Sequence, residues 1–119
     1  MTDQPILVAV YGSLRKGMGN HRLLTSSEQL TTERIKGFDM YSLGAYPFIK
    51  PGDGEITVEV YAVDSHTFSR LDSLEGYPSF YNRMLVQTSI GKAWIYYIAG
   101  RDGKLPVSNG DWVQYYTST

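Results

Sequence analysis

The first strong pattern in the chain is a short, continuous apolar run. Residues 6–10 read Ile-Leu-Val-Ala-Val and are rich in β-branched side chains. A run of this kind is typical of a strand that is buried on both faces. We therefore predict a central strand over residues 6–10, followed by a glycine-containing loop that begins at Tyr11.

Later segments show the alternation or the aromatic content that strands favour. Residues 56–62 alternate apolar with polar side chains, and residues 80–90 and 93–98 are joined by a tight turn that predicts a hairpin. In residues 31–43 the apolar phase slips at Gly37, which predicts a bulge or bend in a long strand or strand pair. Loops or turns are expected at residues 44–47, 51–54 and 100–103, and the tail from residue 105 contains a buriable Trp112 but no clear period.

Two segments carry helical signals. Asn20 can cap a short helix that runs to Glu28, and Asp64 can cap a second helix over residues 65–75. Gly76 is placed to end the second helix, and its apolar stripe consists of Phe68, Leu71 and Leu74. The order of elements differs from the repeated alternation of a doubly wound sheet. It predicts an α+β fold with a small, mixed, barrel-like β-sheet and about two flanking helices.

The composition of the chain excludes several kinds of function. The chain has 119 residues with 42% hydrophobic side chains, no repeat and no linker, which predicts a single domain over residues 1–119. The net charge of −1 argues against nucleic acid as a partner, and the absence of cysteine excludes disulfides, zinc–thiolate sites and cysteine nucleophiles. No segment reads as a membrane span or secretory signal, so we expect a cytoplasmic protein that does not bind membranes. The oligomeric state stays open, with a monomer favoured.

The loop over residues 11–19 is the first candidate site. It contains three glycines and lies between a buried strand and a helix, where backbone amides can hold negative charge. It lacks the ending of a P-loop and the third glycine of a dinucleotide fingerprint. Two other interpretations stay open: a flexible connection with Arg15 and Lys16 in solvent, or a phosphate or nucleotide site that uses those two cations.

Glu75 is the second candidate. It flanks the apolar stripe in the last turn of the predicted helix, where the helix dipole disfavours a carboxylate, and Asp72 adds like-charge repulsion. Burial, dipole and repulsion would all raise its pKa toward the range of a general acid–base group. The alternative is an ordinary glutamate at a frayed, exposed helix end.

Strand aromatics and histidines complete the candidates. Tyr81 and Arg83 share one strand face, Tyr97 faces away from Trp94 and Tyr96, and at least one tyrosine hydroxyl is expected to point into a pocket. His21 and His66 have no ligand spacing and are predicted at helix surfaces, so we expect no metal site. Ser13 lies in no Gly-x-Ser-x-Gly elbow, which argues against a serine hydrolase.

The segment Tyr11-Gly12-Ser13-Leu14-Arg15, directly after the first strand, resembles the opening signature of the gamma-glutamylcyclotransferase-like superfamily. The resemblance is closest to its short members, the gamma-glutamylamine cyclotransferases and their bacterial relatives. Residues 43–47, 71–78 and 81–83 match further motifs in the family's order, and residues 93–97 fit its late aromatic strand. The tail is poorly matched.

The resemblance implies a fold and an activity. It implies a small mixed barrel with flanking helices, a substrate loop made of Tyr11, Gly12, Ser13 and Leu14, and Glu75 at the position of the catalytic glutamate. The implied reaction closes the α-amine of a γ-glutamyl amide onto its γ-carbonyl and releases 5-oxoproline and a free amine. It needs no cofactor and no metal. Weaker pocket candidates are Tyr81, Arg83 and Tyr97. The rival hypothesis is a non-catalytic module that binds a small anionic metabolite in the same pocket.

Overall fold

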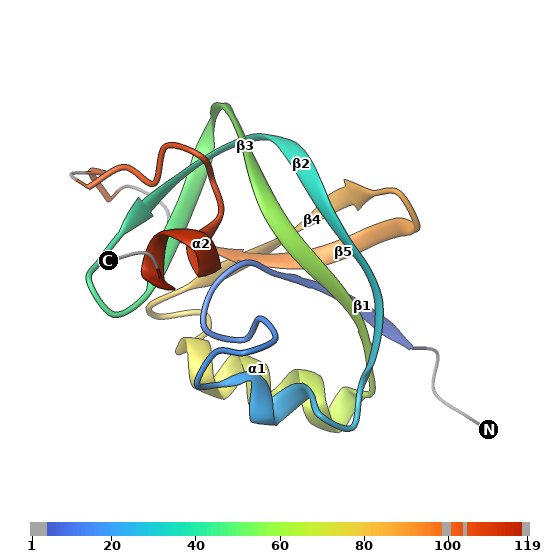
Figure 1. Ribbon diagram of the computed structural model, residues 1–119. Coiled ribbons are helices and arrows are strands. Elements are labelled where there is room, and N and C mark those ends of the chain that lie inside the picture. The colour runs from blue at the N-terminus through green and yellow to red at the C-terminus, as the bar shows by residue number, and fades with distance from the viewer. Residues whose placement is uncertain (1–4, 99–100, 104, 118–119) are drawn as a thin grey trace.

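The computed structural model describes residues 5–98, 101–103 and 105–117, and these form one five-stranded sheet with helices beside it (Figure 1). The strand order is β2-β3-β1-β5-β4, and only the β1–β5 pairing is parallel. This confirms the predicted α+β class and mixed sheet, although the sheet is not closed into a barrel. The elements are β1 (Ile6–Val10), η1 (His21–Leu24), β2 (Glu28–Ser42), β3 (Pro47–Val63), α1 (Ser65–Glu75), β4 (Asn82–Thr88), β5 (Gly91–Tyr97) and α2 (Trp112–Thr117).

Strand β1 lies at the centre of the sheet, as its apolar run predicts. It pairs with β3 along its whole length and with β5 at Val8. Ala9 packs into one hydrophobic cluster and Val8 and Val10 into the other, so both faces of the strand are buried. Because β1 is fixed on both sides, the loop that follows it starts from a rigid point.

Strands β2 and β3 form a long, arched hairpin with a bulge at the predicted place (Figure 1). The register shifts at Gly37, whose φ of 99° needs a residue without a side chain. The predicted separate turn at residues 51–54 is wrong, because these residues belong to β3 and make up the other side of the bulge. The Asp39 carboxylate accepts a hydrogen bond from the Gly54 amide at 2.9 Å and holds this irregularity in place.

Helix α1 begins and ends as predicted. The Asp64 carboxylate accepts a hydrogen bond from the Thr67 amide at 2.7 Å, and Gly76 ends the helix with a left-handed φ of 65°. The predicted helix from Asn20 to Glu28 is wrong in extent. Only one 3₁₀ turn, η1, forms there, because the Asn20 side chain bonds to the preceding loop and Glu28 already pairs with β3.

The C-terminal segment completes the core on one face of the sheet. The Val107 amide donates to the Met40 carbonyl, and the Thr57 amide donates to the Gly110 carbonyl, so the segment adds to the β2–β3 hairpin. Helix α2 then places Trp112, fully buried, in the cluster that includes Ala9. The predicted turn at residues 100–103 lies partly outside the described residues. No helix in the described part of the chain has the length and hydrophobicity to cross a membrane.

Candidate active site

A pocket of about 430 Å³ lies between the loop after β1 and the C-terminal end of α1. The structure brings Glu75 and the loop residues 11–14 to the walls of this one cavity, together with residues of β1, β5 and the connecting segments. The lining residues are Ala9, Val10, Tyr11, Gly12, Ser13, Leu14, Asn20, Ala45, Tyr46, Pro47, Leu74, Glu75, Phe80, Tyr81 and Tyr96.

Glu75 is the last residue of α1, and the chain beyond it is tied back to the helix end. The Tyr81 amide donates to the Glu75 carbonyl at 3.1 Å, and the Phe80 amide donates to the Gly76 carbonyl at 2.8 Å. Burial raises the pKa of the Glu75 carboxyl from 4.5 to about 7. The direction agrees with the sequence prediction, and of the predicted causes burial is the one that raises this pKa.

The predicted repulsion from Asp72 is wrong, because that carboxylate is fully engaged elsewhere. Asp72 accepts two hydrogen bonds from the Arg83 guanidinium, at 3.0 and 3.2 Å, and one from the Tyr96 hydroxyl at 2.7 Å. Its charge is therefore neutralised locally, and Glu75 is left as the acid that lines the pocket among the described residues.

Three buried tyrosines surround Glu75. The Tyr11 hydroxyl donates to the Tyr96 carbonyl at 2.7 Å, and the Tyr81 hydroxyl donates to the Pro47 carbonyl at 2.6 Å. Burial is the main cause that raises the pKa of Tyr11, Tyr81 and Tyr96, and the Glu75 charge adds to the increase in all three. The carboxyl therefore lies within electrostatic reach of three neutral, fixed hydroxyls, whose oxygens keep room to accept a hydrogen bond.

The loop after β1 is held by hydrogen bonds to Gly12 and Ser13. The Arg15 amide donates to the Gly12 carbonyl at 3.0 Å, and Asn20 bonds to Ser13 through both its amide (to the carbonyl, 2.9 Å) and its side chain (to the hydroxyl, 2.9 Å). The amides of residues 12–14 donate to no other group in the part of the chain that the structure describes. A fixed loop with unpaired amides beside a pocket can bind a carboxylate or a developing oxyanion.

Gly12 is required by a close approach and not by its dihedral angles. Its φ is not in the left-handed region, and a Cβ atom there would lie 2.9 Å from the Pro47 ring. Pro47 is itself buried at the start of β3 and lines the same pocket. The absence of a side chain thus lets the loop and β3 close the pocket from two sides.

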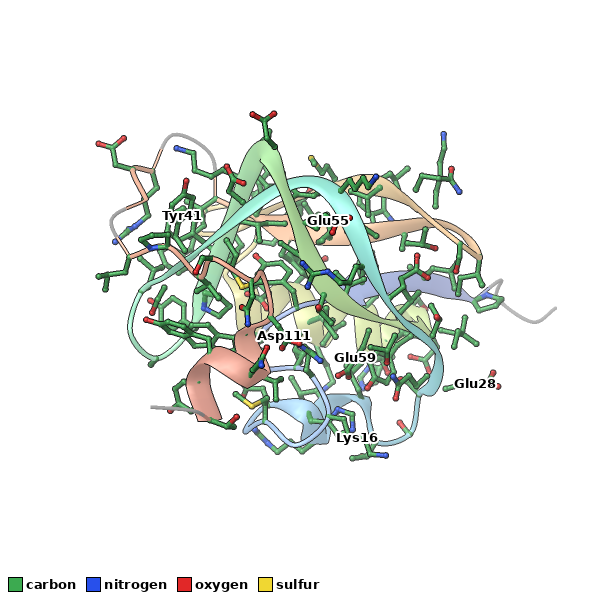
Figure 2. The ribbon with its side chains drawn as sticks, turned by 45° about the horizontal axis from the view of Figure 1, so that its top comes forward. Lys16, Glu28, Tyr41, Glu55, Glu59 and Asp111 are labelled. Carbon is green, nitrogen blue, oxygen red and sulfur yellow. The ribbon has the colours of Figure 1, made fainter. Side chains whose placement is uncertain are left out.

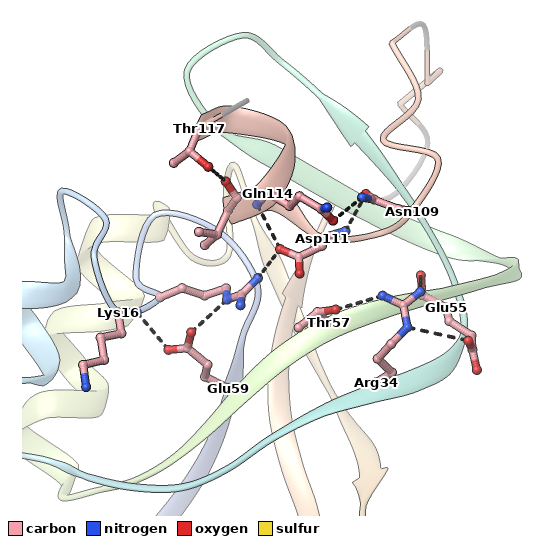
Figure 3. Close-up of polar contacts among 11 residues, drawn as sticks. Lys16, Arg34, Glu55, Thr57, Glu59, Asn109, Asp111, Gln114 and Thr117 are labelled. Carbon is pink, nitrogen blue, oxygen red and sulfur yellow. Dashed lines mark hydrogen bonds and ion pairs between the residues drawn. The ribbon is translucent and has the colours of Figure 1, made fainter. Parts of the chain in front are cut away.

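Arg15 is buried, which overturns both interpretations that placed it in solvent or on a phosphate. Its side chain is 9% exposed and forms ion pairs with Glu59 at 2.9 Å and with Asp111 at 2.8 Å. Glu59 also accepts hydrogen bonds from the Lys16 amide and the Tyr61 hydroxyl. Figures 2 and 3 show Glu59 and Asp111 close together while the Lys16 side chain points away from them.

Asp111 extends this network to the C-terminal helix. Burial acts to raise the pKa of its carboxyl, but hydrogen bonds from the Gln114 amide and from Arg15 hold the pKa below the usual value. Asn109 caps the turn before it by accepting a hydrogen bond from the Asp111 amide (Figure 3). The substrate-loop candidate is therefore tied through Arg15 to β3 and to α2.

Two predicted pocket residues lie elsewhere. Arg83 stacks over the rings of Phe68, Tyr77 and Trp94 at 4.1–4.5 Å and contacts Asp72 outside the cavity. Tyr97 packs against the cluster on the other side of the sheet, so its neighbour Tyr96 lines the pocket instead. The two positions alternate along β5, and the sequence alone could not tell which face carries the cavity.

Histidines and metal-binding side chains contribute little to the site. His66 is exposed on α1, as predicted, whereas His21 is half-buried with its Nδ1 at 3.0 Å from the Leu14 carbonyl. The described residues include no group of three or more histidine, aspartate or glutamate side chains that could hold a metal ion.

Residues 8–114 match the family described as gamma-glutamyl cyclotransferase, AIG2-like. The chain belongs to this family. It is 40% identical over 107 residues to the gamma-glutamylcyclotransferase family protein YtfP of Escherichia coli strain K12, which covers 89% of this chain and 95% of that protein. This membership confirms the resemblance that the sequence motifs carry.

Solved structures agree with this assignment. A crystal structure of a Pyrococcus horikoshii protein superposes with a TM-score of 0.86 at 31% identity, covering 95% of this chain and 94% of that one. The solution structure of YtfP from Escherichia coli gives a TM-score of 0.76 at 38% identity, covering 93% and 99%. The family member described here therefore shares the whole fold of these relatives.

Proposed function

We propose that this family member is a cyclotransferase that converts a γ-glutamyl amide or peptide into 5-oxoproline and a free amine. The observation that carries the proposal is the position of Glu75, an acid with a pKa of about 7, in one pocket with the unpaired amides of residues 12–14. Membership of the gamma-glutamyl cyclotransferase family supports the same reaction class.

In the proposed reaction the substrate supplies its own nucleophile. The α-amine attacks the γ-carbonyl carbon, a five-membered ring closes, and the original amide C–N bond then breaks. Two protons leave the α-nitrogen, which enters as an ammonium group and ends as a lactam N–H, and two protons are gained by the departing amine. The overall reaction releases no proton, so the site needs only a group that can accept a proton and give it back.

Glu75 is suited to this transfer. A carboxyl with a pKa of about 7 is partly ionised at neutral pH, so it can accept a proton from the ammonium group and later donate one to the leaving nitrogen. General acid–base catalysis of this kind is worth about 10²–10⁴ in rate. The amides of residues 12–14 would stabilise the oxyanion that forms on the γ-carbonyl oxygen.

The pocket would also act by positioning. Holding the amine against the carbonyl turns ring closure into an oriented intramolecular step, which can contribute roughly 7–11 kcal/mol. The hydroxyl oxygens of Tyr11 and Tyr81 can accept hydrogen bonds from the substrate ammonium, since each hydroxyl proton is already donated to a backbone carbonyl. The proposed positioning thus uses groups that are fixed before substrate binds.

A screen of γ-glutamyl amides and peptides tests this function, with 5-oxoproline as the readout. Release of 5-oxoproline from at least one compound, above a control without enzyme, is the expected result. Saturable binding of γ-glutamyl compounds without release from any of them would overturn the proposal and favour the non-catalytic binding module.

A further inference from the structure

Large apolar side chains are exposed at the mouth of the pocket. Tyr46, Leu74 and Phe80, here called the mouth cluster, are 38%, 40% and 44% exposed, whereas Tyr11 and Tyr81 deeper in the pocket are each 5% exposed. Eight large hydrophobic residues are exposed in the described part of the chain, and three of them gather here. Such a concentration next to a cavity marks a surface that a ligand covers.

The mouth cluster continues the pocket wall outward from Glu75. The Tyr46 and Phe80 rings meet edge to face with centroids 6.2 Å apart, and Phe80 meets Tyr81 in the same way at 5.1 Å. Leu74 precedes Glu75 at the end of α1. An aromatic surface thus runs from the buried Tyr81 to the exposed Tyr46, beside the acid that would protonate the leaving nitrogen.

In the described part of the chain the pocket is lined by Glu75 and by uncharged side chains. No lysine, arginine or histidine lines the pocket among the described residues. Arg83 is close enough to Tyr96 to influence its hydroxyl electrostatically, but its charge is paired with Asp72. Arg101 influences the Tyr81 hydroxyl in the same way, but it is exposed and does not line the pocket. A carboxylate on the leaving group would lose hydration against the rings without gaining an ion pair inside the pocket.

We infer that the mouth cluster binds an uncharged apolar or aromatic leaving group, so that the preferred substrates are γ-glutamyl amides of hydrophobic amines rather than γ-glutamyl peptides with a free carboxylate. This inference rests on the proposed function, because it assigns the part of the substrate beyond the scissile amide. The glutamyl part would occupy the deeper region beside residues 11–14 and Glu75.

Turnover of three compounds tests the inference: γ-glutamylbenzylamide, γ-glutamylmethylamide and γ-glutamylglycine. The benzylamide should have the highest kcat/KM and γ-glutamylglycine the lowest. F80A should lower kcat/KM for the benzylamide about tenfold or more, and should change the methylamide by less than about threefold, because a small leaving group does not reach the ring. L85A removes a side chain that is 49% exposed on β4, away from the pocket, and should leave all three values unchanged.

Other results would overturn the inference. Preference for γ-glutamylglycine, with a loss of that preference in R101Q, would assign the mouth to an anionic leaving group. If F80A lowers kcat/KM by the same factor for all three compounds, Phe80 has only a structural role. Y46A provides a second variant, with the same expected selectivity, in case F80A does not fold.

Binding separates this inference from the proposed function. The monobenzylamide of glutaric acid and glutarylglycine lack the α-amine and cannot cyclise, so calorimetry measures their affinity alone. Tighter binding of the benzylamide, reduced by F80A, supports the inference even if no γ-glutamyl compound yields 5-oxoproline. Equal affinity for the two compounds would overturn it even if turnover is found.

Discussion

At the scale of single residues, Glu75 is the position at which stability and chemistry place opposite demands on one carboxyl. It belongs to a well-formed helix, yet its carboxyl lies in a pocket whose burial raises the pKa to about 7. A charged carboxylate in this place costs stability, and that cost is what makes the group able to accept and return a proton near neutral pH. Raising the pH through about 7 therefore ionises Glu75, which lowers the stability of the fold but produces the carboxylate that can accept a proton.

E75Q should be more stable than the parent at pH 8 and close to it at pH 5. The folded-state pKa lies above the unfolded value of 4.5, so the stabilising contribution of protonated Glu75 is present below pH 4.5 and is lost as the pH rises through about 7. The largest difference in the free energy of unfolding between E75Q and the parent is about 3 kcal/mol, at roughly 1.4 kcal/mol for each pKa unit. Solvent at the pocket mouth reduces this difference. Urea unfolding at both pH values measures it.

E28Q makes the same chemical change at an exposed position, which Figure 2 shows at the edge of the molecule. Comparison with E28Q separates the effect of the pocket from the general effect of replacing a glutamate by glutamine. A pH-independent difference for E75Q would contradict the raised pKa of Glu75.

At the scale of elements, the substrate-loop candidate depends on how closely it approaches β3. Gly12 lies against the Pro47 ring, which leaves no room for a Cβ atom. Residues 12–14 and Pro47 line the same pocket, so any displacement at this contact also moves the residues that would bind substrate. The glycine loop is visible in the sequence, whereas Pro47, the neighbour that requires Gly12, is brought to it only by the fold.

G12A should destabilise the fold by about 1–3 kcal/mol, the usual cost of overpacking, and should weaken binding of γ-glutamyl compounds. The cause is the 2.9 Å distance from the new Cβ to the Pro47 ring. G19A is the matched control in the same loop, because a Cβ there meets nothing within 4 Å and the φ is not left-handed. Thermal unfolding and calorimetric titration of both variants provide the measurements. Equal effects of the two substitutions would remove the close approach as the reason for Gly12.

At the scale of the whole molecule, one buried ionic network joins three distant parts of the chain. Arg15 from the loop pairs with Glu59 of β3 and with Asp111 before α2, which lies 96 residues away in sequence. Figure 3 shows the network beside the separate pair of Arg34 and Glu55 at the hairpin. The C-terminal segment therefore supports the loop through this network in addition to completing the core with Trp112.

R15Q should lower the free energy of unfolding by about 3–5 kcal/mol, because it leaves the Glu59 charge buried without its partner. R34Q breaks an exposed ion pair with Glu55 and should cost no more than about 1 kcal/mol. Chemical unfolding of the two variants makes the comparison. If both variants lose a similar free energy of unfolding, the buried network contributes no more to stability than a surface ion pair.

The fold was predictable wherever local patterns determine it. The apolar run of β1, the caps of α1 and the glycine bulge of β2 each follow from side chains within a few residues of one another. The short extent of η1, the burial of Arg15 and the choice of Tyr96 over Tyr97 depend on contacts between segments far apart in the chain. Such contacts leave no periodic signal in the sequence.

The candidate site was predictable for a different reason. Glu75 breaks a local preference at its helix end, Gly12 lies in a glycine-containing loop directly after a buried strand, and the four family motifs occur in order around them. The exposure of the mouth cluster was not predictable, because Leu74 falls in the apolar stripe of the helix, and the exposure of Tyr46 and Phe80 shows only in the structure.

The most direct test of the account is release of 5-oxoproline by the parent and by E75Q from the best γ-glutamyl amide found in the screen. Glutamine keeps the size of the side chain but removes its titratable proton. In E75Q, kcat should fall by about 10²–10⁴ while affinity for the matching glutaric acid monoamide changes little. E28Q should retain the parent's turnover. Unchanged release by E75Q from an active parent would contradict the account and remove Glu75 from the chemistry.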